Sequence, residues 1–346
     1  MNEVLTPILA QLTRGVELSA DAVESAMSEL FEGRVTDVQA AAFIVALRTK
    51  GETEGELAAL VHAMYRYGTR VEVPDGAIDT CGTGGDRSGT INVSTMAALV
   101  AAGAGARVVK HGNRAASSKA GSADVLEELG VAIELGPAGV AQCVQDAGVG
   151  FCFAPRYNPA MRFLGPARAQ IGVPTTFNFL GPLANPARVR RQAVGVSDAT
   201  MAARMLGTLR ELGTERAMVF YGVDGLDELT TTTTSTVHEL ADGVLHEYSI
   251  DPLDLGIARA EPSDLVGGNA ATNAQLLRAV LAGEKGPHRD LVVLNAAAAV
   301  VVAGIAPDLA AGVEAACASL DSGAAERALD TLVRVSSAAR AAEGEA

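Results

Sequence analysis

The 346-residue chain is long enough for about two domains, and 49% of its residues are hydrophobic, which excludes intrinsic disorder for most of it. Its 41 acidic residues outnumber its 27 basic ones, and the net charge of −14 disfavours a general nucleic-acid-binding surface. The longest apolar run, residues 291–306, is shorter than the roughly 20 residues of a membrane-spanning helix. We therefore expect a buried helix there and no membrane association.

Four cysteines are widely spaced and include no CxxC pair, which argues against a zinc site and against a disulfide framework. They are Cys81, Cys143, Cys152 and Cys317. The first residues have no basic segment ahead of an apolar one and no cleavage site, so they do not resemble a secretory signal. The expected compartment is a reducing cytoplasm.

Residues 1–70 have apolar positions at helical spacing and predict four short helices. Start signals are Ser19, Thr36 and Thr53, and stop signals are Gly15, Gly33, Gly51 and Gly68. Thr36 is followed at the third position by Gln39, and Thr53 by Glu56. This spacing predicts a reciprocal capping box at each of the two starts.

Beyond residue 71, short runs rich in Val and Ile alternate with Ala-rich helical stretches, a pattern that predicts βαβ units and a mainly parallel, buried sheet. The predicted strands are 77–80, 107–111, 131–134, 149–154, a run from 192 and 217–223, and the helices between them are 93–102, 122–129 and 137–147. The threonine run 230–234 also suits a strand, a hairpin is expected around 242–243, and four helices complete the chain. Residues 158–171 look helical with a break at 165–166, and 172–186 predict a hinge or domain crossing.

The most distinctive motif is a glycine-rich stretch, CGTGGDRSGT, between a predicted strand and a predicted helix. Four glycines fall within residues 82–89, and each costs up to roughly 1 kcal/mol in conformational freedom unless the backbone needs a positive φ or a close approach to a ligand. Its amide groups and the start of the following helix are suited to an anion such as a phosphate. A tight strand-to-helix turn is the alternative, and neither the dinucleotide GxGxxG nor the GxxxxGK[ST] pattern is present.

A basic stretch, KHGNRAASSK, begins at the end of the next predicted strand. No Asp or Glu occurs between Arg87 and Ala123, whereas five basic side chains do: Arg87, Arg107, Lys110, Arg114 and Lys119. A solvated basic face is the alternative, but it would contain interspersed acids. Because adjacent parallel strands end at one crevice, we expect the glycine-rich and basic loops to flank the same polyanion.

Asp227 and Glu228 follow the predicted strand 217–223, within the sequence DGLDEL. Neighbouring carboxylates repel each other unless a cation lies between them, and Mg²⁺ prefers oxygen ligands of this kind. An ordinary surface turn is the alternative, which a nearby polyphosphate site disfavours. His62 and His238 are expected to be structural, and His246 and His288 to lie near turns.

Taken together, these motifs resemble the anthranilate phosphoribosyltransferases along the whole chain. The resemblance rests on GTGGD, NVST, KHGNRAASS, the helix start at residues 121–124, NFLGPLANP at 178–186 and DGLDELTTTTT, in this order. It implies an α/β fold class, in which a small all-helical domain is joined by hinges to a larger α/β domain with a mainly parallel sheet. The implied domains are residues 1–72 with 158–181, and 73–157 with 182–346. It also implies a homodimer formed through the helical domain.

The resemblance implies a donor site for phosphoribosyl pyrophosphate (PRPP) and an acceptor site for anthranilate. The donor site would comprise Gly82, Gly85, Asp86, Thr90, Asn92, Val93, Ser94, Thr95, Lys110, His111, Gly112, Asn113, Arg114, Ala115, Ala116, Ser117, Ser118 and Ser122. Ser94, Asp227 and Glu228 would bind Mg²⁺, with two ions expected. The acceptor site would comprise Gly82, Asn113, Arg168 and Asn158, and the Arg168 guanidinium suits a carboxylate because it can bind one in a bidentate fork.

One position departs from the family, which commonly has histidine where this chain has Asn158 on the acceptor's route inward. Asparagine keeps the hydrogen-bonding capacity but lacks the imidazole ring, so acceptor affinity or selectivity is the property it affects. In the implied reaction the anthranilate amine displaces pyrophosphate from the ribose. We expect positioning by Gly82, Lys110 and His111, with no residue acting as nucleophile or essential general base.

Two alternatives remain open at this point. A pyrimidine-nucleoside phosphorylase shares the architecture, although the DGLDE and NFLGPLANP segments argue against it. A non-catalytic paralogue that binds nucleic acid is disfavoured by the net charge and by Asp227, Glu228 and Arg168.

Overall fold

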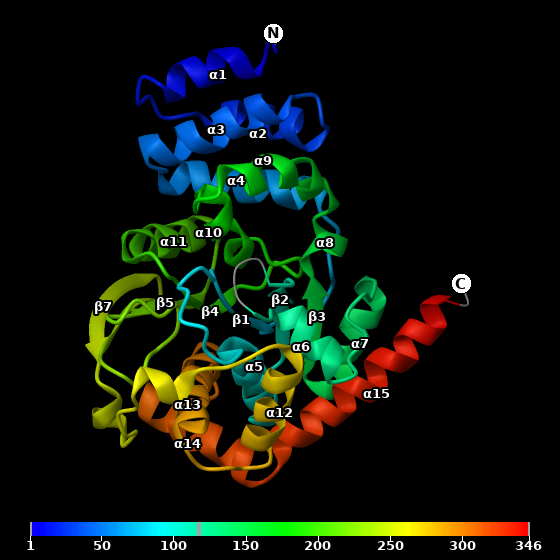
Figure 1. The fold of residues 1–346 in the computed structure, drawn as a ribbon, viewed down its shortest axis with the longest axis vertical. Coiled ribbons are helices and arrows are strands. Elements are labelled where there is room, and N and C mark those ends of the chain that lie inside the picture. Colours follow the sequence, from blue (N-terminus) through cyan, green and yellow to red (C-terminus); the bar gives the residue numbers. More distant parts are fainter. Residues whose placement is uncertain (1, 116–118, 345–346) are drawn as a thin grey trace.

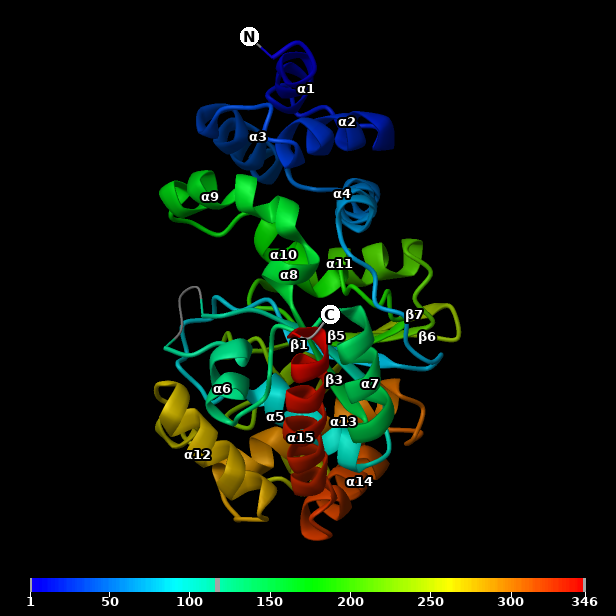
Figure 2. The same ribbon diagram turned by 90° about the vertical axis from the view of Figure 1, so that its right-hand side faces the viewer.

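The fold was analysed in a computed structural model that describes residues 2–115 and 119–344. A bundle of N-terminal helices lies at one end of the molecule, a seven-stranded sheet lies in the middle, and the last helices lie at the other end (Figures 1 and 2). None of the helices in the described residues is long and apolar enough to cross a bilayer. This two-part α/β architecture confirms the predicted fold class.

Four helices form the N-terminal bundle, as the sequence predicts: α1 (Leu5–Leu12), α2 (Ala20–Phe31), α3 (Asp37–Lys50) and α4 (Glu54–Tyr67). Both predicted capping boxes are present, because the Thr36 hydroxyl accepts from Gln39 N at 3.3 Å and the Thr53 hydroxyl accepts from Glu56 N at 3.2 Å. The side chains of Gln39 and Glu56 accept in return from the backbone N–H groups of the two threonines. Local sequence alone therefore determines where α3 and α4 begin.

The sheet has the strand order β3-β2-β1-β4-β5-β6-β7, parallel from β3 to β5 and antiparallel at β6 and β7. Its strands are β1 (Ile78–Gly82), β2 (Val108–Gly112), β3 (Val149–Phe153), β4 (Arg191–Gly195), β5 (Arg216–Gly222), β6 (Ser235–Ala241) and β7 (Val244–Ile250). The order reverses at β1, which has β2 on one side and β4 on the other. A crevice outside the carboxyl ends of the strands at such a reversal is where open α/β sheets bind ligands.

Helices cover both faces of the sheet, and each face has its own hydrophobic cluster. In β5, Met218 and Phe220 belong to one cluster, whereas Ala217 and Val219 belong to the other, which continues into the N-terminal bundle. The remaining helices are α5 (Val93–Gly103), α6 (Ser122–Glu128), α7 (Pro137–Ala147), α8 (Ala154–Tyr157), α9 (Gly165–Ile171), α10 (Thr176–Leu183), α11 (Ala199–Glu211), α12 (Ala270–Leu281), α13 (Pro287–Val302), α14 (Leu309–Asp321) and α15 (Ala324–Gly344). Short 3₁₀ helices span Pro159–Phe163, Pro252–Leu255 and Pro262–Leu265.

After β3 the chain leaves the sheet and returns to the bundle before it forms β4. In this excursion α9 packs on α3, and α10 packs between the bundle and the sheet, where it contacts α3, α4 and β2. The predicted hinge 172–186 thus contains a helix, α10, that the sequence analysis did not anticipate. Figure 2 shows α9 and α10 descending from the bundle toward the sheet.

Two predicted strands are wrong. Residues 131–134 alternate buried and less buried side chains but pair with no strand. Two of their backbone groups pair with side chains instead, since Ala132 N donates to Ser336 Oγ at 3.1 Å and Arg340 Nη1 donates to Glu134 O at 2.7 Å. Residues 230–234 wrap around Asp224, whose carboxylate accepts from the Thr230 hydroxyl at 2.8 Å, and the strand starts only at 235.

Candidate functional site

The glycine-rich loop follows β1 directly. Gly84, Gly85 and Gly89 have φ angles of 67°, 89° and 69°, and Arg87 has φ 59°. The Asp86 carboxylate closes the turn by accepting from Ser88 N at 3.2 Å and from Ser88 Oγ at 2.7 Å. The backbone conformation therefore requires these glycines, as is typical of loops whose amides face an anion.

This loop contacts the turn that carries Asp227 and Glu228, called the acidic turn below. Gly84 N donates to Asp227 Oδ2 at 2.6 Å, and a β-carbon on Gly82 would lie 2.5 Å from the same oxygen. Gly195, at the end of β4, is even closer to the Asp227 backbone and leaves no room for a side chain. The ends of β1 and β4 and the turn after β5 thus meet at the point where the strand order reverses.

The two acidic side chains of the turn are each only 8% exposed. Burial, reinforced by the charge of Asp86, raises the pKa of Asp227 to about 8. Burial and the charge of Asp227 raise the pKa of Glu228 well above its ordinary value, while Lys110 opposes this rise and Ser94 N–H donates to the carboxylate. Three carboxyl groups are thus crowded together, which a divalent cation would relieve.

Lys110, on β2, lies on the other side of the same space. Its ammonium is buried, with 2% exposure, and Nζ donates to Thr80 O at 2.8 Å and to Ser94 Oγ at 3.0 Å. Within residues 2–115 and 119–344, this ammonium has no ion pair. A buried cation with neutral partners and one free donor is suited to an incoming anion.

The imidazole of His111 is buried beside Lys110 and makes a hydrogen bond through one nitrogen only. Nδ1 lies 3.0 Å from Gly181 O, and Nε2 has no partner among the described residues. Because a carbonyl oxygen can only accept, the proton is on Nδ1 and the lone pair is on Nε2. Burial lowers the pKa of His111 to about 4, so the ring is neutral at neutral pH.

The basic loop after β2 is fastened to the start of α6. The Asp124 carboxylate accepts from Ala115 N at 3.0 Å and from Gly121 N at 2.8 Å, and Arg114 pairs with both Asp124 and Glu127. Asn113 is exposed at the end of this loop, and Ser122 begins α6. The predicted donor residues Ala116, Ser117 and Ser118 lie outside the described residues.

Four predicted donor residues form the start of α5: Asn92, Val93, Ser94 and Thr95. Asn92 Nδ2 donates to Ala120 O at 3.1 Å, which joins this helix start to the basic loop. The first turn of α5 contains no acidic residue, so its positive dipole end is not neutralised from within the helix, and Ser94 N–H donates to Glu228. Thr90 forms an isolated bridge with Val266, which holds the end of the glycine-rich loop.

Asn273, on α12, is a residue of this region that the sequence analysis missed. It is 2% exposed, its Oδ1 accepts from Gly268 N at 2.6 Å, and its Nδ2 donates to Asn92 Oδ1 at 2.7 Å. Gly267 N in turn donates to Gly89 O at 2.8 Å. Asn273 thus holds residues 265–268 against the glycine-rich loop, a role that only its partners in space reveal.

Arg168, on α9, is half-buried, and burial lowers its pKa. Its guanidinium has no hydrogen bond or ion pair within the described part of the chain. Such a group has all five N–H donors available for a carboxylate.

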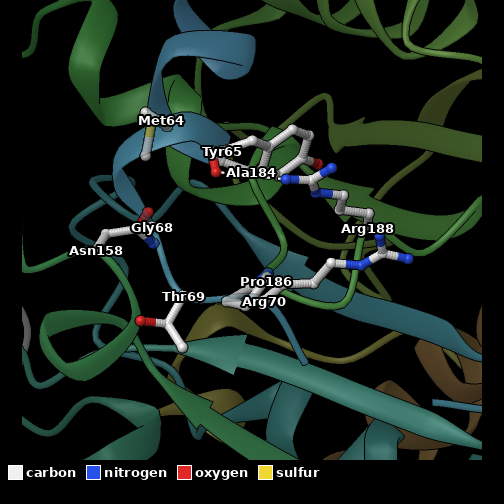
Figure 3. A pocket seen from close by; sticks show the side chains of 9 residues that line it. All are labelled: Met64, Tyr65, Gly68, Thr69, Arg70, Asn158, Ala184, Pro186 and Arg188. Atoms are coloured by element: carbon white, nitrogen blue, oxygen red, sulfur yellow. Dashed lines mark hydrogen bonds between the residues drawn. The ribbon is translucent and has the colours of Figure 1, made fainter. Parts of the chain in front are cut away.

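Asn158 lies against the end of α4 and not beside the donor loops. A β-carbon on Gly68 would lie 3.0 Å from Asn158 Oδ1, and Asn158 Nδ2 is buried without a partner in the described residues. Both residues line a cavity of about 10 Å³ with Tyr65 and Arg188, as Figure 3 shows. This cavity has room for about one water molecule, and its lining includes none of the other predicted site residues.

Mg²⁺ fits the acidic turn only with help from a substrate. No cluster of three or more His, Cys, Asp or Glu side chains in the described ranges could hold a metal ion. Mg²⁺ is commonly bound by one or two carboxylates together with substrate phosphates and water, which matches Asp227 and Glu228 facing Lys110 and the glycine-rich loop. The crowded carboxyl groups are the observation that makes the residues fit this ion.

Comparison with known proteins identifies the family. Residues 6–68 match the glycosyl transferase family, helical bundle domain, and residues 75–326 match the glycosyl transferase family, a/b domain. An anthranilate phosphoribosyltransferase from Nocardioides sp. is 54% identical over 331 residues, covering 94% of this chain and 97% of that protein.

Solved structures agree with this sequence relationship. The anthranilate phosphoribosyltransferase of Thermus thermophilus superimposes with a TM-score of 0.90 at 41% identity, covering 95% of this chain and 98% of that one. The enzyme of Saccharomyces cerevisiae in complex with PRPP and Mg superimposes with a TM-score of 0.88 at 26% identity, covering 98% and 99%. The chain belongs to the anthranilate phosphoribosyltransferase family.

Proposed function

We propose that this protein transfers the 5-phosphoribosyl group of PRPP to the amine of anthranilate, releasing pyrophosphate. The observation that carries the proposal is the meeting of three features at the reversal of strand order: the glycine-rich loop, the buried Lys110 ammonium and the Asp227–Glu228 turn. Together they offer amide donors, a cation and metal ligands to one polyanion. Family membership supports the same reaction.

The donor site is proposed to use the backbone of the glycine-rich loop and the start of α5 for the phosphates. Lys110 is held between Thr80 and Ser94, so it is placed to neutralise charge on the departing pyrophosphate without moving. Arg114 is engaged with Asp124 and Glu127, and we expect it to shape the loop more than to bind phosphate by itself.

Asp227, Glu228 and Ser94 are the residues that would hold Mg²⁺, and we propose two ions. When bound, Mg²⁺ neutralises the oxygens of the pyrophosphate leaving group. The Gly84 N–H donates to the Asp227 carboxylate and the Ser94 N–H donates to the Glu228 carboxylate, which holds both in place. The complex of the yeast relative with PRPP and Mg supports Mg²⁺ as the ion.

The acceptor site is proposed to use the Arg168 guanidinium for the anthranilate carboxylate, with Asn113 and Gly82 close to the ring. Asn158 would act at the hinge side, where it adjoins Gly68 rather than the donor loops. An aromatic amine is unprotonated at neutral pH, so it needs positioning more than deprotonation. Correct alignment can supply roughly 7–11 kcal/mol of the barrier.

In the reaction, the bond from the ribose C1 to the pyrophosphate oxygen breaks, the bond from C1 to the amine nitrogen forms, and the amine loses one proton to the released pyrophosphate or to solvent. His111 is neutral, and its unpaired Nε2 can accept a hydrogen bond from that amine. A pKa of about 4 makes it a weak base, which agrees with a positioning role. We propose no covalent enzyme intermediate.

We also propose that the protein forms a homodimer through the N-terminal bundle. We propose a reducing cytoplasm as its location. All four cysteines are free, and three of them, Cys81, Cys143 and Cys152, are buried.

The direct test mixes the protein with PRPP, Mg²⁺ and anthranilate and follows the loss of anthranilate fluorescence. The chain contains no tryptophan, so protein emission does not interfere in this assay. Consumption that requires all three components supports the proposal. Cleavage of thymidine or uridine with phosphate, and no consumption of anthranilate, would instead identify a nucleoside phosphorylase.

A further inference from the structure

The segment that ends α10 is part of the NFLGPLANP stretch, to which the proposed reaction assigns no role. Three successive carbonyls in its last turn accept from side chains of other elements. Gly181 O accepts from His111 Nδ1 at 3.0 Å, Pro182 O accepts from Gln192 Nε2 at 2.8 Å, and Leu183 O accepts from the Tyr65 hydroxyl at 3.2 Å. The helix end is thereby fixed to β2, β4 and α4, and Gly181 O also accepts from Ala184 N at 3.2 Å.

Asn185 follows this turn and is only 1% exposed. Its Nδ2 donates to Asp79 Oδ2 at 2.7 Å and to Val109 O at 2.8 Å, and its Oδ1 accepts from Ala187 N at 2.8 Å. Both donors of the amide are therefore used within the sheet. Such complete pairing at a fully buried amide specifies one position for the segment.

Asp79 lies inside β1 and is completely buried. Its Oδ1 accepts from His111 N at 3.2 Å, while Oδ2 accepts from Asn185. Burial raises its pKa to about 6, opposed by the Lys110 charge and by these hydrogen bonds. A carboxyl group in a sheet interior costs stability, and no step of the proposed reaction uses it, so its presence needs another explanation.

These contacts form a closed ring. Asp79 holds the backbone of His111, the imidazole of His111 holds Gly181, and Asn185, four residues later, returns to Asp79. The ring joins the loop predicted to bind PRPP to the helix that continues from α9, which carries Arg168. It also fixes the direction of the unpaired His111 Nε2.

We infer that Asp79 and Asn185 are positioning residues that set the acceptor side of the site relative to the donor loops. They act through His111 and α10, without touching either substrate. This inference deepens the proposed function, on which it rests. It predicts a selective effect, because Lys110 is held separately by Thr80 and Ser94. Loss of the Asp79–Asn185 pair should therefore misplace the acceptor while donor binding persists.

Asn185→Ala tests the inference most directly. We expect the anthranilate KM to rise at least about tenfold and kcat to fall, while the dissociation constant of PRPP with Mg²⁺, measured by calorimetry without acceptor, stays within about twofold. Ser336→Ala is the matched control, because Ser336 is also fully buried and bonded to a backbone N–H but contacts none of the site residues. It should lower the melting temperature and leave both KM values unchanged.

A reciprocal exchange separates positioning from general stability. Asp79→Asn alone leaves one acceptor for two donors, His111 N and Asn185 Nδ2, and Asn185→Asp alone places two carboxyl groups together. In the double variant Asp79→Asn with Asn185→Asp, the new amide at position 79 can again donate to position 185 and accept from His111 N, but the acid at position 185 must keep a proton in order to donate to Val109 O. We expect its anthranilate KM to recover part of the loss of either single variant, and more of it at low pH, where that acid is protonated. The Asn185→Asp defect should lessen at low pH, where the two carboxyl groups can share a proton.

A readout independent of turnover is the ¹⁵N NMR signal of His111. In the wild type it should report the Nδ1–H tautomer down to about pH 5, and in Asn185→Ala the pKa should move toward the ordinary value of about 6.5. An unchanged anthranilate KM in Asn185→Ala, equal weakening of PRPP binding, or an exchange variant no better than the single variants even at low pH would overturn the inference. A wild-type protein that binds PRPP but does not consume anthranilate would refute the proposed function. An unchanged His111 NMR signal in Asn185→Ala would refute the ring of contacts through Asp79, His111 and Asn185.

Discussion

Gly82 and Asp227 are packed so closely that a β-carbon on Gly82 would lie 2.5 Å from the Asp227 Oδ2 and 3.3 Å from its Cγ. The same oxygen accepts from Gly84 N. The residue that ends β1 thus determines how far an acidic side chain of a distant turn can enter the site. Glycine is needed here for close approach, since its φ is not positive.

Gly82→Ala should therefore displace the Asp227 carboxylate. We expect the concentration of Mg²⁺ needed for half-maximal activity to rise about tenfold or more, with a smaller loss of stability. The measurement is an Mg²⁺ titration of turnover at saturating PRPP. Gly55→Ala is the control, because its β-carbon would make only an ordinary contact, 3.9 Å from Glu211. Unchanged Mg²⁺ dependence in Gly82→Ala would contradict the role of this contact.

Asp227→Asn combined with Glu228→Gln should abolish most turnover and most of the dependence on Mg²⁺. The amides keep similar shapes but remove the charges that would bind a hard cation. Asp242→Asn, the same chemical change at an exposed hairpin turn, should have no effect. A double variant whose Mg²⁺ titration matches that of the wild type would exclude these carboxylates as metal ligands.

Arg168→Ala should raise the anthranilate KM far more than the PRPP KM. A charge-assisted bidentate pair is worth about 1.5–3 kcal/mol, which corresponds to roughly a 10- to 150-fold effect. Arg168→Lys should recover only part of it, because an ammonium cannot form the planar fork. Arg162→Ala, at an exposed position of the same segment, is the control. Equal changes in both KM values would remove Arg168 from the acceptor site.

Asn273→Ala should raise the PRPP KM, by roughly 5- to 30-fold, since the loss of about 1–2 kcal/mol of hydrogen bonding frees residues 265–268 and one side of Asn92. Steady-state kinetics at saturating anthranilate would measure this. Asn269→Ala removes the N-cap of the same helix and should cost about 1 kcal/mol of stability without changing the PRPP KM. If both variants raise the PRPP KM equally, the effect comes from loss of α12 and not from the Asn273–Asn92 contact.

The pH dependence of stability should reveal Asp79. Because burial raises its pKa from 3.8 to about 6, the folded protein holds a proton that the unfolded chain has released between these values. The contribution of this carboxyl group to the free energy of unfolding therefore falls as pH rises from about 4 to about 6, and stays low above that. Asp79→Asn lacks this loss, so its stability relative to the wild type should improve over this window by on the order of 3 kcal/mol. Urea unfolding followed by circular dichroism at several pH values measures it, and a constant difference would refute the shift.

The parts of the fold that could be predicted are those that local sequence determines. The capping boxes at Thr36 and Thr53, the helix between Pro137 and Gly148, and the hairpin at 242–243 depend on neighbouring residues and are confirmed. The strands predicted at 131–134 and 230–234 are wrong because several of their backbone groups pair with side chains instead of with a neighbouring strand, as Ala132 N does with Ser336 Oγ and Thr230 N with Ser235 Oγ. The helix α10 was missed because its Gly and Pro residues suggested a break, although Pro182 occupies its last turn.

The same distinction applies to the candidate site, where local sequence reveals the loops but not the residues that position them. Its loops could be located because Gly, Lys and Asp cluster in short motifs at the ends of predicted strands. Asp79, Asn185 and Asn273 could not be assigned a role, since each contacts a partner more than 25 residues away in the chain. Asp79 and Asn273 lie outside the motifs, and Asn185 lies within NFLGPLANP, but nothing in its neighbouring residues identifies Asp79 as its partner. The departure at Asn158 is visible in the sequence, but only the structure places this residue beside Gly68.

The long excursion between β3 and β4 also affects how the chain can fold. Ile78 of β1 pairs with Arg191 of β4, so one edge of β1 has no partner until residues 154–190 have passed through the bundle and returned. During synthesis, a chain that ends at β3 presents an unpaired strand edge, the kind of surface that promotes aggregation. A pairing between residues so distant in the chain is expected to form slowly, since the loop must close before the contacts form. The strand that leads into the glycine-rich loop thus waits longest along the chain for its second neighbour, and its open edge is the place where a chaperone is expected to bind the nascent chain.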